Sequence, residues 1–235
     1  MIDLEIDYRV FVAELLGTFL LTFSVSMSGG QPLAVGGALW LGMIITRFRS
    51  GAQFNPAVTL SVLTRTLLDG DTNKSKLLTL VLNIPCQILG GLLAGFLAWS
   101  VSTETFFFKI SSDFKLSQAF LSEMLFTMLL CLNVHQAGKA KRGLLLEGGM
   151  IASTLATCAF TIGHITRNCV NPAVEIGLGV AHYADHDEGM KKAWLYVMAP
   201  VVGGTIAAVV SKVRRYWEVD PRLSKTMDFK LLDVN

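Results

Sequence analysis

The chain has 235 residues, of which 52% are hydrophobic and only 16% carry a charge, and its formal net charge is +2. Soluble globular domains average about 25% charged residues, so the composition excludes an ordinary soluble domain. A net charge this small also gives no reason to expect a nucleic acid as partner.

Six apolar runs follow one another along the chain, and the second of them is short. They cover residues 10–30, 33–46, 77–102, 116–134, 144–164 and 193–211. A helix needs about 20 apolar residues to cross the hydrocarbon core of a bilayer. We therefore predict an all-α integral membrane protein with six transmembrane helices.

The basic residues predict the orientation of these helices. If both termini are cytoplasmic, 15 of the 20 lysines and arginines fall on the cytoplasmic side. The outer side then keeps Lys109, Lys115, Arg167, Lys191 and Lys192. This distribution obeys the positive-inside rule, so we expect both termini in the cytoplasm.

The stretch "SGAQFNPAVTL" at residues 50–60 interrupts the apolar pattern with a polar segment and a proline. Asn is a preferred N-cap and Pro is favoured at the first helical position, so Asn55, Pro56 and Ala57 predict a helix start. The apolar run that follows is too short to span a bilayer but suits a re-entrant half-helix. The same tripeptide returns at residues 171–173 and predicts a second one.

The chain also contains an internal repeat. "FVAELLGTFLLTF" at residues 11–23 is echoed by "FLSEMLFTMLLCL" at 120–132, and the two Asn-Pro-Ala copies are offset by 116. Each half, about 1–110 and 111–235, holds three spans, so the second half must enter the membrane from the opposite side. We therefore predict an inverted repeat with the functional site near the midplane.

Two half-helices that meet at their N-termini would direct two partial positive charges at one point of a pore. Cations would be repelled there, and the amides of Asn55 and Asn171 would donate hydrogen bonds to a passing oxygen. The alternative, that each Asn is only a helix cap, is weakened because the motif occurs at both repeat-related sites.

These motifs, together with "VNPAVEIG" and "AWLYVMAPVVGG", resemble the aquaporin (major intrinsic protein) family over nearly the whole chain. The resemblance implies six tilted spans, two half-helices, a homotetramer in the lipid bilayer, and one pore per subunit for water or small neutral solutes. It also implies that Glu14 and Glu123 are buried carboxylates that brace the loops before the half-helices. No cofactor or metal is implied.

The chain departs from the family at the outer selectivity filter. Family spacing places its walls at Val35, Ala159, Asn168 and Val174, where Val174 replaces the usual Arg. The expected filter is small, mostly apolar and uncharged, which predicts a wider mouth and weaker exclusion of cations at that point.

Three residues near the second motif remain open to two interpretations. Arg167 either replaces the missing filter arginine or, as we expect, faces the outer vestibule. Cys169 is either a thiol at the pore or a packed buried one. Glu175 lies where glycerol-conducting members usually carry Asp, although the last span resembles water-selective members. The cluster at residues 182–188, with His164 nearby, is expected to be solvated and not a metal site.

Two alternatives to a passive channel come from other classes of protein. A coupled secondary transporter would need an ionisable residue in the pathway, and Glu175 is the nearest candidate. A closed, structural membrane protein would need binding segments that the short loops do not offer. An enzyme is not expected, because the sequence contains no catalytic, metal or phosphate-binding constellation.

Overall fold

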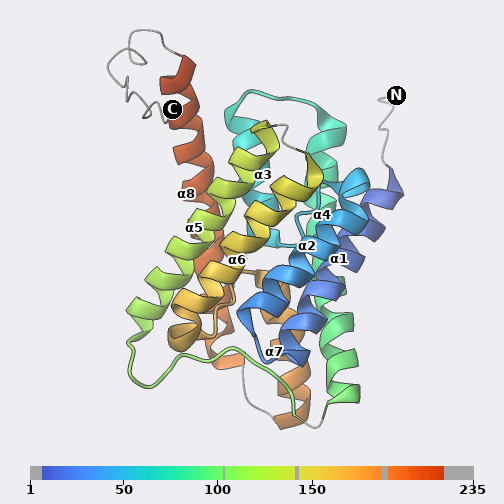
Figure 1. Cartoon of the computed structure of the whole chain (residues 1–235), viewed down its shortest axis with the longest axis vertical. Helices are drawn as coiled ribbons and strands as arrows, with labels where there is room; N and C mark the ends of the chain where they lie inside the picture. Colours follow the sequence, from blue (N-terminus) through green and yellow to red (C-terminus); the bar gives the residue numbers. More distant parts are fainter. Residues whose placement is uncertain (1–6, 103, 141–142, 187–189, 220–235) are drawn as a thin grey trace, which may run out of the picture.

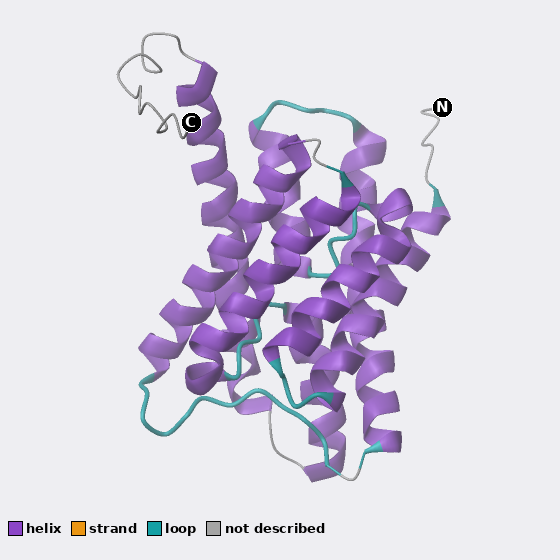
Figure 2. Cartoon of the chain, in the orientation of Figure 1, coloured by secondary structure: helices purple, strands orange, loops and turns teal. Residues whose placement is uncertain are grey.

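The computed structural model describes residues 7–102, 104–140, 143–186 and 190–219. All of the regular structure in these ranges is helical (Figures 1 and 2). The predicted all-α architecture is therefore confirmed.

The six predicted spans are α1, α2, α4, α5, α6 and α8. Their bounds are Tyr8–Met27, Pro32–Ser50, Lys74–Val101, Leu116–Ala140, Leu144–Thr166 and Ala193–Val219. Five of these helices are long and apolar enough to cross a membrane, and the apolar part of α2, Pro32–Thr46, is shorter. Several helices continue beyond the apolar run, because backbone hydrogen bonding continues where the side chains become polar.

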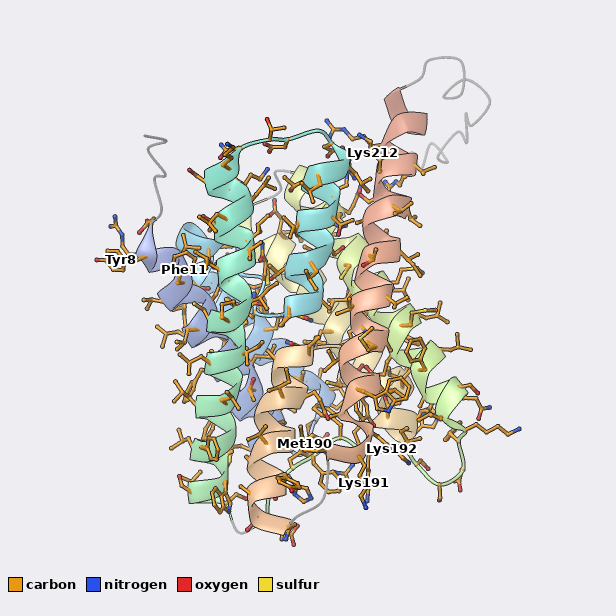
Figure 3. The ribbon with its side chains drawn as sticks, turned by 180° about the vertical axis from the view of Figure 1, so that it is seen from behind. Tyr8, Phe11, Met190, Lys191, Lys192 and Lys212 are labelled. Carbon is orange, nitrogen blue, oxygen red and sulfur yellow. The ribbon has the colours of Figure 1, made fainter. Side chains whose placement is uncertain are left out.

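The two half-helices are α3 (Pro56–Leu68) and α7 (Pro172–His186). A short 3-10 helix, η1 (Met190–Lys192), leads from α7 into α8. Seen from behind, α3 occupies the upper half of the bundle and α7 the lower half (Figure 3). The two half-helices lie in opposite halves of the bundle, and their proline-led N-terminal ends are turned toward the middle.

Glycines allow close contacts between the helices, and the contacts in one half resemble those in the other. A side chain at Gly90 of α4 would overlap the carbonyl of Leu15 in α1, and one at Gly203 of α8 would overlap that of Met124 in α5. The next glycine on each helix faces a half-helix. These pairs are Gly91 with Ala173, and Gly204 with Ala57. Such close approach is how helices associate in lipid, where no hydrophobic force draws them together.

The half-helices are thus held by the opposite half of the chain: α7 packs on α4, and α3 packs on α8. The helix α1 begins at the same end of the bundle at which α8 ends (Figure 1). An even number of crossings requires this arrangement. At the other end, a long connection from α4 leads to α5 and contains Phe106 and Phe107.

Candidate functional site

The loops that precede the half-helices share an unusual backbone. Gly51, Ala52 and Phe54 have φ angles of 80°, 54° and 50°. Arg167, Asn168 and Val170, each 116 positions later, have φ angles of 66°, 56° and 45°. Residues other than Gly rarely adopt this left-handed conformation, which costs about 1 kcal/mol or more for each. Six residues in matching positions hold it, so the surrounding contacts must enforce it.

Glu14 and Glu123 supply such contacts. Glu14 is fully buried in α1 and accepts hydrogen bonds from the backbone N–H groups of Gln53 (3.0 Å) and Phe54 (2.8 Å). Glu123 is equally buried in α5 and accepts from those of Cys169 (3.0 Å) and Val170 (2.7 Å). Each carboxylate therefore satisfies two buried donors of one loop, as the loop-bracing role would require.

The two asparagines cap the half-helices and also join them. The Oδ1 of Asn55 accepts from the N–H of Ala57 (2.9 Å), and the Oδ1 of Asn171 accepts from that of Ala173 (3.0 Å). The Nδ2 of Asn55 donates to the carbonyl of Val170 (2.8 Å). The Nδ2 of Asn171 donates to the carbonyl of Phe54 (2.9 Å). These bonds cross between the halves of the chain, so they fix the two helix starts against each other.

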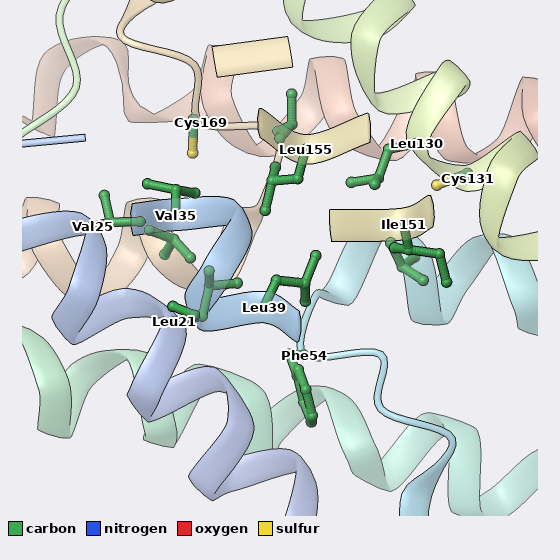
Figure 4. Close-up of a cluster of buried hydrophobic side chains, with 14 of the residues drawn as sticks. Leu21, Val25, Val35, Leu39, Phe54, Leu130, Cys131, Ile151, Leu155 and Cys169 are labelled. Atoms are coloured by element: carbon green, nitrogen blue, oxygen red, sulfur yellow. The ribbon is translucent and has the colours of Figure 1, made fainter. Parts of the chain in front are cut away.

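A narrow cavity of about 30 Å³ lies beside this junction. Its lining residues are Leu21, Val25, Val35, Leu39, Ala52, Gln53, Asn55, Val58, Leu130, Val134, Ile151, Leu155, Asn168, Cys169, Asn171 and Val174. Figure 4 shows aliphatic side chains of this lining from α1, α2 and α6, together with Leu130 of α5. The polar groups come from the two loops, so the cavity has an apolar wall and a polar stripe. We call it the pore cavity.

None of the residues that line the pore cavity, within the described part of the chain, is acidic or basic. The buried Oδ1 of Asn168 has no protein partner among the described residues. A cavity needs roughly 10–15 Å³ to hold one water. A cavity of about 30 Å³ is therefore large enough for two or three waters beside the two asparagines.

Three of the four expected filter residues, Val35, Asn168 and Val174, line the pore cavity. Ala159 does not; it lines a second cavity of about 530 Å³ near the end of the bundle opposite the two termini, which we call the outer cavity. Gly29, Gly30, Gln31, Pro32, Phe106, Phe160, Gly163, His164 and Arg167 complete that lining. Because alanine has only a methyl group, Ala159 adds less bulk between the pore cavity and the outer cavity than a larger residue would.

Arg167 lies in the outer cavity and does not line the pore cavity. Cys169 lines the pore cavity although it is 4% exposed, and its thiol donates to the carbonyl of Asn171 (3.2 Å). Glu175 is buried and faces away from the pore cavity, and its Oε2 has no partner among the described residues. Among the described residues, Glu175 therefore does not supply the pore cavity with the ionisable side chain that the transporter alternative requires.

The histidine cluster divides between two environments. His182 is buried, stacks on Phe107 with ring centroids 3.8 Å apart, and shares a hydrogen bond with Thr105 (2.6 Å). His186 pairs with Asp185 at 2.9 Å, and His164 lines the outer cavity. Asp187 and Glu188 lie outside the described residues. Within the described residues there is no group of three ligands that could hold a metal.

Sequence reasoning missed Gln87, a fully buried amide in α4. Its Nε2 donates to Glu14 (2.7 Å) and to the hydroxyl of Thr59 (2.8 Å), which donates in turn to Gln53 (2.8 Å). A polar residue within an apolar span is costly unless it is paired. That rule, applied to Gln87 in the sequence, would have found it.

Comparisons with known proteins agree with this geometry. The sequence model of the major intrinsic protein family matches residues 3–211. The glycerol uptake facilitator protein-like 6 of Lactiplantibacillus plantarum is 29% identical over 224 residues, covering 87% of this chain and 97% of that protein. Nodulin-26 of Glycine max is 29% identical over 236 residues, covering 92% of this chain and 80% of that protein.

Solved structures extend the likeness to the fold. The aquaglyceroporin from Plasmodium falciparum matches with a TM-score of 0.74 at 21% identity, covering 88% of this chain and 96% of that chain. Proteins of the matched family are passive membrane channels for water or small solutes and are not enzymes. The chain belongs to the major intrinsic protein family and is an integral membrane protein with several spans.

Proposed function

We propose that the chain is a passive channel for water and small neutral solutes of the glycerol, urea, ammonia or hydrogen peroxide class, and that it excludes ions and protons. The observation that carries this proposal is the pore cavity, where Asn55 and Asn171 meet at two abutting helix starts. An uncharged, narrow lining with two amide donors suits neutral guests that carry an oxygen or nitrogen.

Ion exclusion follows from the same arrangement. Each helix N-terminus carries roughly half a positive charge, so two of them at one place repel cations. Each amide nitrogen has two hydrogens, and one of them is used in the bond to the opposite loop. The second hydrogen is left for a guest oxygen. A water that accepts from both asparagines has both of its own hydrogens turned away, which interrupts a proton relay.

The choice of solute depends on the outer part of the pore. Val35 and Val174 make it apolar, and the unpartnered Oδ1 of Asn168 supplies an acceptor for a solute O–H or N–H. An apolar wall opposite a polar stripe complements a solute with a carbon backbone and hydroxyl or amide groups. We therefore expect solutes larger than water to pass, in accord with the similarity to the glycerol uptake facilitator protein-like 6 of L. plantarum.

Flux into vesicles that contain the purified protein tests this proposal. Water, glycerol and urea permeabilities are compared for the wild type, Val174→Arg and the conservative control Val174→Ile. Because Arg adds bulk and charge to the wall, we expect Val174→Arg to reduce glycerol flux about tenfold or more, and water flux less. A wild-type permeability equal to that of empty vesicles would overturn the proposal. An unchanged glycerol-to-water ratio in Val174→Arg would show that the filter lies elsewhere.

We also propose a homotetramer with both termini in the cytoplasm. The face between α2 and α6 supports the assembly, because it carries an apolar groove lined by small residues such as Gly37 and Gly149. Small residues of this kind let helices of neighbouring subunits approach closely. Native mass spectrometry in mild detergent checks the stoichiometry, and protease access to tags at each terminus checks the orientation.

A further inference from the structure

Arg167 is the fixed cation of the outer cavity, and its environment is unusual for an arginine. Its Nη1 donates to the carbonyl of Phe107 (2.9 Å). Its guanidinium carbon lies 5.3 Å from the ring centroid of Phe106 and 5.5 Å from that of Phe107. No carboxylate of the described residues lies within 4.0 Å of it. The charge is therefore held by a carbonyl and two π faces, none of which neutralises it.

The backbone at Arg167 adopts a conformation that favours glycine. Arg167 has a φ of 66° at the end of α6, and its repeat-related position is Gly51, with a φ of 80°. Glycine adopts this conformation without strain, whereas any other residue does so at a cost of about 1 kcal/mol. An arginine at such a point suggests that its side chain has a use in the outer cavity.

The position of Phe107 is fixed in turn. Its ring stacks on buried His182 with centroids 3.8 Å apart, and Thr105 bonds the same histidine. The loop that carries Phe106 and Phe107 is thus anchored to α7. Arg167 is held from outside the pore wall, while its chain neighbour Asn168 lines the pore cavity.

We propose that Arg167 is the cation barrier of the outer mouth. It places a positive charge beside the mouth without narrowing it, since the wall at that level consists of Val35, Asn168 and Val174. Width and charge are then set by different residues: the valines leave room for solutes larger than water, and Arg167 repels hydrated cations before they reach the pore cavity. This inference rests on the proposed channel function.

A thiol reporter tests the charge directly. Gln31 is exposed in the outer cavity, so Gln31→Cys places a thiol there. We compare the rates at which a cationic and an anionic methanethiosulfonate react with this thiol. The parent chain, which lacks the added cysteine, gives the background rate for each reagent. A unit charge within about 10 Å, at an effective dielectric constant of about 20, changes the local concentration of a monovalent ion about tenfold.

We expect Arg167→Met to raise the cation-to-anion rate ratio about tenfold or more at low salt, and Arg167→Lys to leave it nearly unchanged. Lys191→Met is the matched control, because it removes an exposed charge from the same end but outside the cavity lining. In 1 M salt, where the screening length is about 3 Å, the ratio in Gln31→Cys alone should approach the ratio that the two reagents show with a free thiol in solution. A ratio insensitive to Arg167→Met would overturn the assignment, whatever its salt dependence.

Flux measurements separate this inference from the channel proposal. In vesicles, Arg167→Met should keep the glycerol flux of Lys191→Met, because Arg167 does not line the pore cavity. Retained glycerol flux together with an unchanged reagent-rate ratio would refute the barrier while the channel stands. Absence of glycerol flux in the wild type would refute the channel, whatever the reporter shows.

Discussion

Replacing Glu123 by glutamine tests whether the carboxylates hold the loops in place. Glu123 is fully buried and accepts from two backbone N–H groups, at 3.0 and 2.7 Å. Glutamine has the same shape but only one acceptor oxygen, so its NH₂ group must face one of these donors. An unsatisfied buried donor costs about 1–3 kcal/mol, and the remaining bond loses its charge assistance. We therefore expect a loss of about 2–4 kcal/mol.

Thermal melting of the purified protein, followed by the fluorescence of its four tryptophans, measures this effect. For chains of this length, 1 kcal/mol corresponds to a shift of about 2–4 °C in Tm, so Glu123→Gln should melt about 5–15 °C lower. Ser122→Ala is the control, since it removes only a hydroxyl bonded to its own helix. Equal melting temperatures and equal solute flux in the two variants would refute the bracing role.

Two further predictions concern helix packing and a charged contact at the end of α3. Gly91→Ala should prevent folding or lower Tm by several degrees, because the new methyl group meets the carbonyl of Ala173. Gly163→Ala, with nothing near its added methyl group, should melt like the wild type. Burial alone would raise the pKa of Asp69, but its bonds to Lys212 and Arg65 hold that pKa below its ordinary value. This stabilisation is present near neutral pH and is lost as pH falls through the lowered pKa. Asp69→Asn should therefore melt below the wild type at pH 7, by an amount that shrinks in acid.

The sequence predicted the spans and half-helices well because their signals are local. Asn55 before Pro56 satisfies the preferences of a helix start without help from distant residues. The repeat then predicted a matching start at Pro172. Helix ends were less accurate: α5 continues to Ala140 and α8 to Val219, since the apolar pattern marks the membrane-facing length and not the length of the helix.

The arrangement around the pore depended on contacts that the sequence could not supply. The bond from Asn55 to Val170 joins residues 115 positions apart, and only the packing of the two halves determines it. Glu175 follows a pore-lining residue in sequence, yet the helical rotation of about 100° per residue takes it out of the lining of the pore cavity. Family spacing placed Ala159 in the filter, and the structure brings it into the outer cavity instead.

The constraints on the loops explain how such a scaffold can accept a different filter. Each loop is held by two N–H bonds to a buried carboxylate and by one asparagine bond to the opposite loop. None of these bonds involves the side chain of Val35 or Val174. Substitutions at those two positions therefore change the width and polarity of the mouth without removing a support of the junction. Selectivity at the mouth can then vary independently of the junction at which we propose that ions are excluded, because the two depend on separate sets of contacts.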